Sequence, residues 1–320
     1  MPSSLLTLYA DLAQQVRFAG KGGTVYRRTI GGAAYLYAKV PVGGTRRDLF
    51  LGREEDEAVQ EQAAAVRREA EAARERRATV RMLRRRGLRG PDAWLGRILD
   101  AVADADLFAR GIVLVGTGAY QLMEPLVAHH LPEASLMTGD VDLCTADLAI
   151  RAEGGESMET VLQRADPSMS GVPELDLRDP PSRFRGKSAL VDLLTPILRR
   201  TDATPMPLRE LKAGAAPLQY LRWLIDEPID AVALWGAGVA VTIPAPARYA
   251  IHKLILAQRR HRTSREKRFK DLHQASALIA ALQAADPFAV EDALEEARSR
   301  GEEGWVRPIA RSLAELELDL

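Results

Sequence analysis

The chain has 320 residues, about the length of two average domains, and its hydrophobic fraction of 47% is enough for a sizeable core. Basic and acidic side chains number 44 each, so no overall charge points to nucleic acid. No apolar stretch approaches the roughly 18 residues of a membrane-spanning helix, and we see no secretory leader, so we expect no membrane contact. The single cysteine, Cys144, excludes an internal disulfide and a cysteine-rich zinc site and fits a cytoplasmic protein.

The balanced total hides an asymmetry between the two ends of the chain. Residues 1–53 carry eight basic and two acidic side chains, whereas residues 286–320 carry four arginines and ten acids. A basic terminal region of this kind is typical of proteins with a polyanionic partner. Further arginines follow between residues 74 and 89.

Residues 24–51 predict three short antiparallel strands with turns at 31–32 and 41–44. A period of two places Tyr35, Tyr37 and Lys39 on one face and Leu36, Ala38 and Val40 on the other. Tyrosines beside basic residues could stack on single-stranded nucleic acid. The alternative, which we favour at this point, is an amphipathic sheet packed on the rest of the protein.

The remaining elements follow from periodicity and from Gly and Pro positions. A long charged helix is predicted from about residue 53 to 86, because its acidic start and basic end complement the helix dipole. A helix at about 92–108 leads into an apolar strand at 112–115. Residues 153–186 predict a long surface excursion around short extended pieces. A strand at 188–194, a short helix at 218–225, a hairpin at 231–243 and helices from Pro246 onward complete the chain.

The first chemical signal is the sequence Gly116-Thr117-Gly118 after the apolar strand. A strand that ends in glycine and passes into a helix leaves backbone N–H groups free to hold an anion. A dinucleotide fingerprint is excluded, because it needs glycine where Gln121 stands.

Two carboxylates, Asp140 and Asp142, lie two residues apart on a second predicted strand and so share one face. Like charges in this arrangement repel unless a proton or a cation lies between them, and carboxylates with substrate phosphates are typical ligands of Mg²⁺. Asp192 lies on a later apolar strand and is the preferred third acid. Asp176 is a rival with less strand-like flanks. Taken alone, the Asp140 and Asp142 motif has an alternative interpretation, a pair of acidic side chains that bind no metal.

The second cluster lies on the predicted helices at 249–274. Lys253 and Arg260 are two turns apart on one face, and Lys267, Lys270 and Gln274 share an arc opposite the apolar Phe269, Leu272, Ala275 and Ile279. An ordinary solvated face, with Lys267 and Asp271 as an i,i+4 pair, is the alternative.

The segments LVGTGAY, TGDVDLC and VDLLTP resemble the hG[G/S]…Dh[D/E]h…h[D/E]h signature of the polymerase-β-type nucleotidyltransferase superfamily. Together with PAPARYAIHKL, they resemble a bacterial family of nucleotidyltransferase-fold proteins over about residues 24–300. The resemblance implies that Asp140, Asp142 and Asp192 bind two Mg²⁺ ions, with Mn²⁺ as a substitute, and that Asp192 helps to activate the attacking hydroxyl. It further implies that Gly116 and Thr117 contact the nucleotide phosphates.

Two features depart from that signature. The hydroxyl residue is threonine rather than the more usual serine, and 22 residues separate Thr117 from Asp140, which implies an insertion around residues 129–136. The second cluster resembles the K-L-x-A-(x)n-[R/K]-D-L motif of AbiEii-like nucleotidyltransferase toxins. That resemblance implies that Lys253 and Lys270 hold the triphosphate, with Arg260 beside them, and that Asp271 is an auxiliary catalytic acid.

We therefore predict an α+β protein with a small mixed nucleotidyltransferase sheet and flanking helices. Residues 1–90 form a β module with a long helix, residues 91–205 the core, and residues 206–320 a mainly helical domain that closes the nucleotide site. The expected reaction moves a nucleoside monophosphate from an NTP to a hydroxyl, most simply that of an RNA such as a tRNA 3′ end. A protein or small-molecule acceptor is one alternative. An inert nucleic-acid-binding or antitoxin-associated module is another.

Overall fold

The computed structural model describes residues 1–20, 22–42, 45–132, 139–146, 156–187, 189–197, 204–261 and 263–320. Helices make up 47% and strands 22% of the chain, which confirms the predicted α+β class. No helix among these residues is both long enough and apolar enough to span a membrane.

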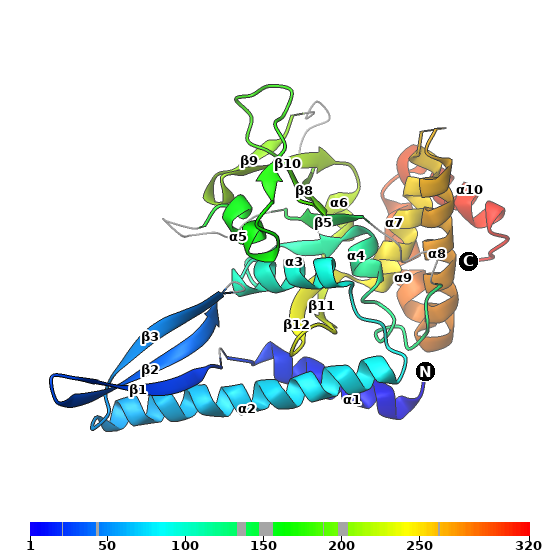
Figure 1. The fold of residues 1–320 in the computed structure, drawn as a ribbon. Helices are drawn as coiled ribbons and strands as arrows, with labels where there is room; N and C mark the ends of the chain where they lie inside the picture. Colours follow the sequence, from blue (N-terminus) through cyan, green and yellow to red (C-terminus); the bar gives the residue numbers. More distant parts are fainter. Residues whose placement is uncertain are drawn as a thin grey trace.

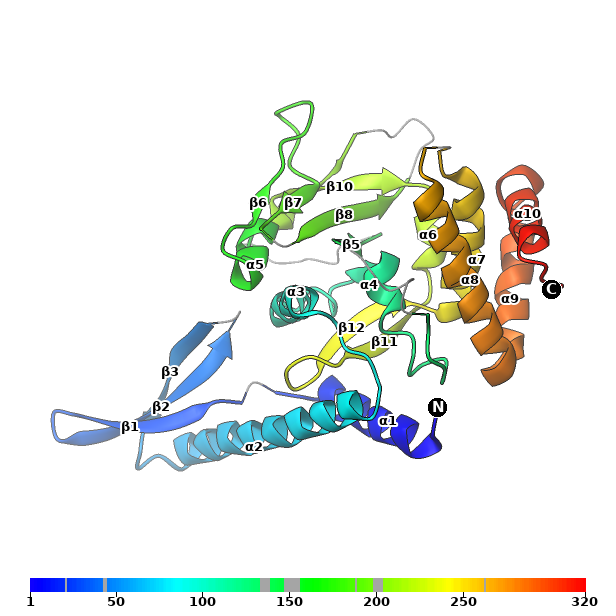
Figure 2. The same cartoon turned by 45° about the vertical axis from the view of Figure 1, so that its right-hand side comes forward.

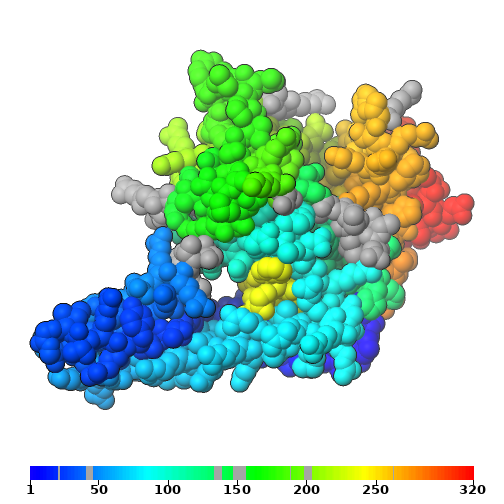
Figure 3. Space-filling model, in the orientation of Figure 1, coloured from blue at the N-terminus to red at the C-terminus, as the bar shows by residue number. Residues whose placement is uncertain are grey.

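The N-terminal part of the molecule is an arm that projects from the body (Figures 1 and 3). It consists of the antiparallel strands β1 (Thr24–Ile30), β2 (Ala33–Val42) and β3 (Thr45–Arg53), and of the start of helix α2 (Glu57–Arg85). The predicted strands are confirmed, although β2 continues to Val42, where we expected a turn. Gly43 and Gly44 lie outside the described residues.

The arm sheet has the two faces that the period of two predicts. Leu36, Ala38 and Val40 are buried, and Leu36 packs with Val59 and Ala63 of α2. The expected packing of an amphipathic sheet on the rest of the protein is found at helix α2, which lies against its apolar face. On the opposite face Tyr26, Tyr35 and Tyr37 are partly exposed and Phe50 is exposed.

Helix α1 (Ser3–Arg17) is an element that the sequence reading did not assign. Its apolar residues Leu5, Tyr9, Leu12 and Val16 recur at helical spacing and are buried against the end of α2 and the hairpin β11 (Pro228–Ala233) and β12 (Val239–Pro244). This small core ties the base of the arm to the body.

The central sheet is mixed, as predicted, with the strand order β4-β5-β8-β10-β9. Its β5–β8 and β8–β10 pairs are parallel, whereas the β4–β5 and β9–β10 pairs are antiparallel. The short strands β6 (Ser170–Gly171) and β7 (Arg183–Arg185) extend it beside β8. The other bounds are β4 Val113–Val115, β5 Asp140–Cys144, β8 Leu190–Pro196, β9 Met206–Leu208 and β10 Ala213–Leu218.

Helix α3 (Ala93–Asp104) contacts α5 (Met158–Ala165) and strand β12. α5 corrects the expectation of an irregular excursion at 153–186, because Met158, Val161 and Leu162 form a buried stripe on it. The charged and proline-rich flanks of this segment concealed an eight-residue helix. Residues 151–155, and residues 133–136 of the expected insertion, lie outside the described residues.

The C-terminal helices stand at the carboxyl ends of β8 and β10 (Figure 2). Helix α7 contacts α6, α8, α9 and α10, and it is buried on nearly every side. The bounds are α6 Leu221–Leu224, α7 Pro246–Arg259, α8 Arg265–Ala285, α9 Pro287–Ser299, the short π-helix η3 Glu302–Val306 and α10 Arg307–Glu315. The five-residue helix α4 (Gly116–Tyr120) follows β4, and the 3-10 turn η2 (Arg209–Leu211) joins β9 to β10.

Candidate active site

The structure brings the three preferred carboxylates to one region of the central sheet. Asp140 and Asp142 alternate with the buried Val141 on β5, and Asp142 is the direct cross-strand partner of Asp192 on β8. The strands therefore place the side chains of Asp142 and Asp192 on the same face. The rival Asp176 lies in the loop between β6 and β7 and is ion-paired with Arg178.

Burial and like charge act together on Asp142. Its pKa rises to about 6, first because it is buried and then because Asp192 and Asp140 repel its charge, while Lys253 partly opposes the rise. A bound cation would remove this penalty, so the region favours positive charge.

Arg183 on β7 supplies one such charge. Its guanidinium donates two hydrogen bonds to the carboxylate of Asp192, at 2.6 and 3.1 Å. Among the described residues, no three carboxylate, imidazole or thiol groups lie close enough together to hold a metal ion on their own. The pair of Asp140 and Asp142 still fits Mg²⁺, which commonly takes one or two carboxylates and completes its shell with substrate phosphates.

Gly116 lies directly against the carboxylate of Asp142. Its φ is +64°, and a Cβ built there would lie 2.0 Å from Oδ2 of Asp142. The hydroxyl of Tyr249 on α7 lies 2.9 Å from the Gly116 carbonyl oxygen and 3.0 Å from Oε1 of Gln274 on α8. The strand-to-helix turn is thus held by both helices.

Thr117 is buried beneath this turn. Its hydroxyl lies 3.5 Å from Nε2 of Gln274, at the outer limit of a hydrogen bond. Gly116 therefore lines a cavity, whereas Thr117 packs between α4 and α8.

The predicted basic residues converge on one buried acid. Asp271, only 2% exposed, accepts hydrogen bonds from Nζ of Lys253 at 2.7 Å and from Nε of Arg260 at 2.8 Å. Burial alone would raise the pKa of Asp271, but Lys253 and Arg260 lower it below its usual value. Asp271 is therefore ionised and holds the two cations in place.

This finding corrects two expectations about α8. The alternative of a solvated face is wrong at Asp271, which pairs with Lys253 and Arg260 from the neighbouring helix. Phe269, which we expected on the buried face, is half exposed, whereas Gln274 is fully buried. Lys270 is half-buried, and its pKa is lowered by burial and by Lys253, although Asp271, Asp140 and Asp142 oppose that shift.

A cavity of about 430 Å³ opens beside these groups. Asp142, Gly116, Lys253 and Arg260 line one side of it. Most of its remaining wall is apolar and comes from the ends of β8 and β10 and from α6 and α7: Leu194, Ile197, Pro217, Leu218, Leu221, Leu224 and Leu256. A cavity with charged groups beside a largely apolar wall, here called the apolar chamber, suits a ligand with an anionic end and a flat, less polar end.

Tyr220 also lines the cavity and has a left-handed conformation, with φ at +67°. Arg259 lies 4.9 Å from the centre of its ring, and Trp305 packs edge-on against it at 5.0 Å. A non-glycine residue in this conformation stores strain, which is characteristic of ligand-binding segments.

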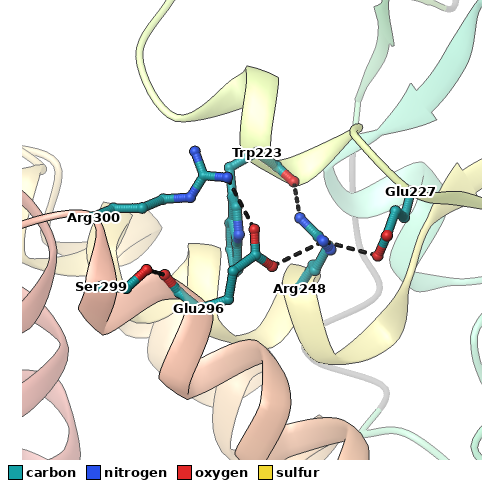
Figure 4. Close-up of polar contacts among 6 residues, drawn as sticks. All are labelled: Trp223, Glu227, Arg248, Glu296, Ser299 and Arg300. Atoms are coloured by element: carbon teal, nitrogen blue, oxygen red, sulfur yellow. Dashed lines mark hydrogen bonds and ion pairs between the residues drawn. The ribbon is translucent and has the colours of Figure 1, made fainter.

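Arg248 of α7 is the centre of a cluster of polar contacts (Figure 4). Its guanidinium donates to the Trp223 carbonyl oxygen and pairs with Glu227 and with Glu296 of α9. Glu296 is also paired with Arg300. One buried arginine thus ties α6, α7 and α9 together around the chamber.

His252 also lines the cavity. It is 4% exposed, and neither ring nitrogen has a hydrogen-bond partner among the described residues. Burial and the neighbouring Lys253 lower its pKa to about 3, so its imidazole is neutral at pH 7.

Sequence reasoning missed Arg183, Tyr249, His252 and Gln274. The alternation of Arg183-Phe184-Arg185 was a signal for a strand with outward arginines. The other three are ordinary helix residues in the sequence, and only the packing of α7 on α8 gives them a role.

Replacing Gly116 with alanine should lower the free energy of unfolding by at least about 1 kcal/mol more than Gly236→Ala, because the new Cβ must displace Asp142. Gly236 is the matched control, since its φ is +57° and a Cβ there meets no atom within 4 Å. Urea unfolding of both variants measures the difference. Equal losses would mean that the Asp142 carboxylate is not held against the turn.

His252 should make the protein sensitive to acid. Its pKa in the folded state is about 3, below the roughly 6.5 of an unfolded chain, so its contribution is complete above pH 6.5 and is lost as the pH falls toward 3. Between pH 7.5 and 5 the parent chain should therefore lose about 2 kcal/mol more unfolding free energy than His252→Leu. Parallel pH profiles for the two proteins would contradict the burial of a neutral imidazole.

Comparison with known proteins agrees with this geometry. A family model described as nucleotidyltransferase matches residues 94–299, which span the sheet, the carboxylates and the basic helices. No curated protein and no solved structure matches the chain. The more specific likeness to AbiEii-like toxins has no support beyond the motif. The chain belongs to the nucleotidyltransferase family and is an enzyme that transfers a nucleoside monophosphate from an NTP.

Proposed function

We propose that this enzyme transfers the nucleoside monophosphate to a hydroxyl of RNA in a reaction that depends on Mg²⁺. The observation that carries the proposal is the register that sets Asp192 beside Asp142, which lines a cavity together with Lys253 and Arg260. Negative groups for a cation and positive groups for a triphosphate thus meet at one point.

In this proposal Asp140 and Asp142 would hold the metal, and Asp192, which is paired with Arg183, would complete its carboxylate ligands. The bound ions would neutralise the carboxylates and the phosphate oxygens at the reacting centre. Mn²⁺ has the same preference for oxygen ligands and would substitute. The proposed role of the Asp192 carboxylate is to take the proton of the attacking hydroxyl.

The triphosphate lies along Lys253, Arg260 and Lys270. Asp271 acts through the first two of these residues: it fixes their side chains and is itself too well paired to serve as a proton donor. The Gly116 turn lies next to the phosphates, and Thr117 supports that turn from beneath.

The apolar chamber takes the sugar and base. Tyr220, which contacts Arg259 and Trp305, offers a ring on which the base can stack. Closure of the apolar wall around the nucleotide excludes water, which would otherwise compete with the acceptor hydroxyl.

RNA is the acceptor that the charge distribution supports best, because residues 1–53, which include the three arm strands, carry eight basic and only two acidic side chains. The protein acceptor and the antitoxin-associated module remain as outcomes of one test. Each labelled NTP is incubated with the enzyme, Mg²⁺ and cell extract, and the products are separated into RNA and protein. Label in protein alone would overturn the RNA proposal.

Asp140→Asn, Asp142→Asn and Asp192→Asn should each reduce nucleotidyl transfer by at least about a thousandfold, because each removes a group that acts on the reacting phosphate. Asp176→Asn, which changes a carboxylate outside the sheet, should transfer at the parent rate. The rate of pyrophosphate release measures all four. A normal rate for Asp192→Asn with a deficient Asp176→Asn would reverse the choice of the third carboxylate.

Lys253→Met should weaken NTP binding by about ten- to a hundredfold, the loss of one charge-assisted hydrogen bond to phosphate. Lys212→Met is the matched control, since Lys212 is exposed and does not line the cavity. Titration calorimetry with Mg²⁺ gives both affinities, and circular dichroism checks that each variant is folded. Equal affinities would show that Lys253 serves Asp271 alone.

A further inference from the structure

The outer face of the arm sheet carries a row of aromatic rings that crosses all three strands. Tyr26, Tyr37 and Phe50 are direct cross-strand neighbours. The rings of Tyr26 and Tyr37 are stacked with centroids 5.6 Å apart, and Phe50 lies 5.2 Å from Tyr37. Tyr35 extends the row at 5.9 Å from Phe50. We propose that this face binds the single-stranded part of an RNA.

The exposure of Phe50 argues against a purely structural role for the row. The opposite face of the same sheet is the one that packs on α2, through Leu36 and its neighbours. Phe50 keeps 57% of its surface exposed on the outer face. A ring left open to water in the middle of an aromatic row offers its face to a stacking partner.

The charges on this face select the kind of partner. The register places Arg28, Lys39, Arg46 and Arg53 on the aromatic side, together with a single acid, Asp48. Asp48 is hydrogen-bonded to the Tyr26 hydroxyl, and the Arg28 guanidinium lies 5.8 Å from the centre of the Tyr37 ring. Stacking rings interleaved with cations match a strand of unpaired bases joined by phosphates. A second copy of this face would be repelled by its own charge.

The position of the arm makes its outer face accessible to an RNA acceptor. The arm projects well beyond the body in the space-filling view, so a long strand can reach it (Figure 3). The arm is anchored through α2 to the small core around Leu83, α1 and the hairpin. The proposal rests on the proposed function only in one respect, that the bound strand is the acceptor.

Binding of a fluorescein-labelled, unstructured 20-nucleotide RNA tests the platform by itself. The full chain is used with EDTA and without NTP, so that the reading does not depend on metal or catalysis. Phe50→Ala and Tyr37→Ala should each weaken binding about tenfold, as expected for the loss of one stacked base. Phe50→Trp keeps an aromatic ring and should retain the parent affinity.

Two controls use exposed residues of the same type elsewhere. Phe288 on α9 is 70% exposed, and Phe288→Ala should bind RNA as the parent chain does. Arg27 and Arg28 are neighbours on opposite faces of β1, and Arg27 is paired with Glu54. Arg28→Ala should therefore weaken binding and flatten its salt dependence, whereas Arg27→Ala should do neither.

Three results would overturn the platform: equal losses for Phe50→Ala and Phe288→Ala, a duplex bound as tightly as the single strand, or no RNA binding at low ionic strength. Nucleotidyl transfer to the same RNA is measured separately. RNA binding by the parent chain and its loss in Phe50→Ala, without transfer to any RNA, would support the platform and reject RNA as the acceptor.

Discussion

Repulsion between Asp142 and Asp192 is the constraint on which the rest of the site depends. Two parallel strands set these carboxylates side by side where water has little access, so the charge of each must be offset from nearby. Arg183 offsets Asp192 and Lys253 acts on Asp142. The free-energy cost of two like charges in one place thus explains why Arg183 of β7 and Lys253 of α7 lie near them.

The same constraint explains the buried ion cluster behind the cavity. A lysine as buried as Lys253 needs a counter-charge, and Asp271 provides one while also holding Arg260. Every charged group of this network has a neighbour of opposite sign. Asp192 lies beside Arg183, Asp142 near Lys253, and Asp271 between Lys253 and Arg260. Such a network keeps its members charged and fixed in position, which is the state in which they can meet an anionic ligand without reorganising.

The fold and the carboxylates were predictable because they depend on local pattern. A period of two placed Asp140 and Asp142 on one face, and apolar flanks marked the strand of Asp192. The arm strands followed from glycines and alternation. Helices α1 and α5 were missed because polar and charged flanks masked their short apolar stripes. The pairing of Asp192 with Arg183, and of Asp271 with Lys253, depends on strand order and helix packing, which no local pattern encodes.

Helix α7 shows why so much chemistry depends on one element. Because it is buried on nearly all sides, residues on each of its faces contact a different neighbour. Arg248 ties α6 and α9, Tyr249 holds the Gly116 turn, and Lys253 binds Asp271 on α8. These contacts lie around one cavity. A shift of α7 would therefore move the Gly116 turn and the cations Lys253 and Arg260 together. The burial that raises the pKa of Asp142 and keeps His252 neutral therefore also couples the groups that line this cavity.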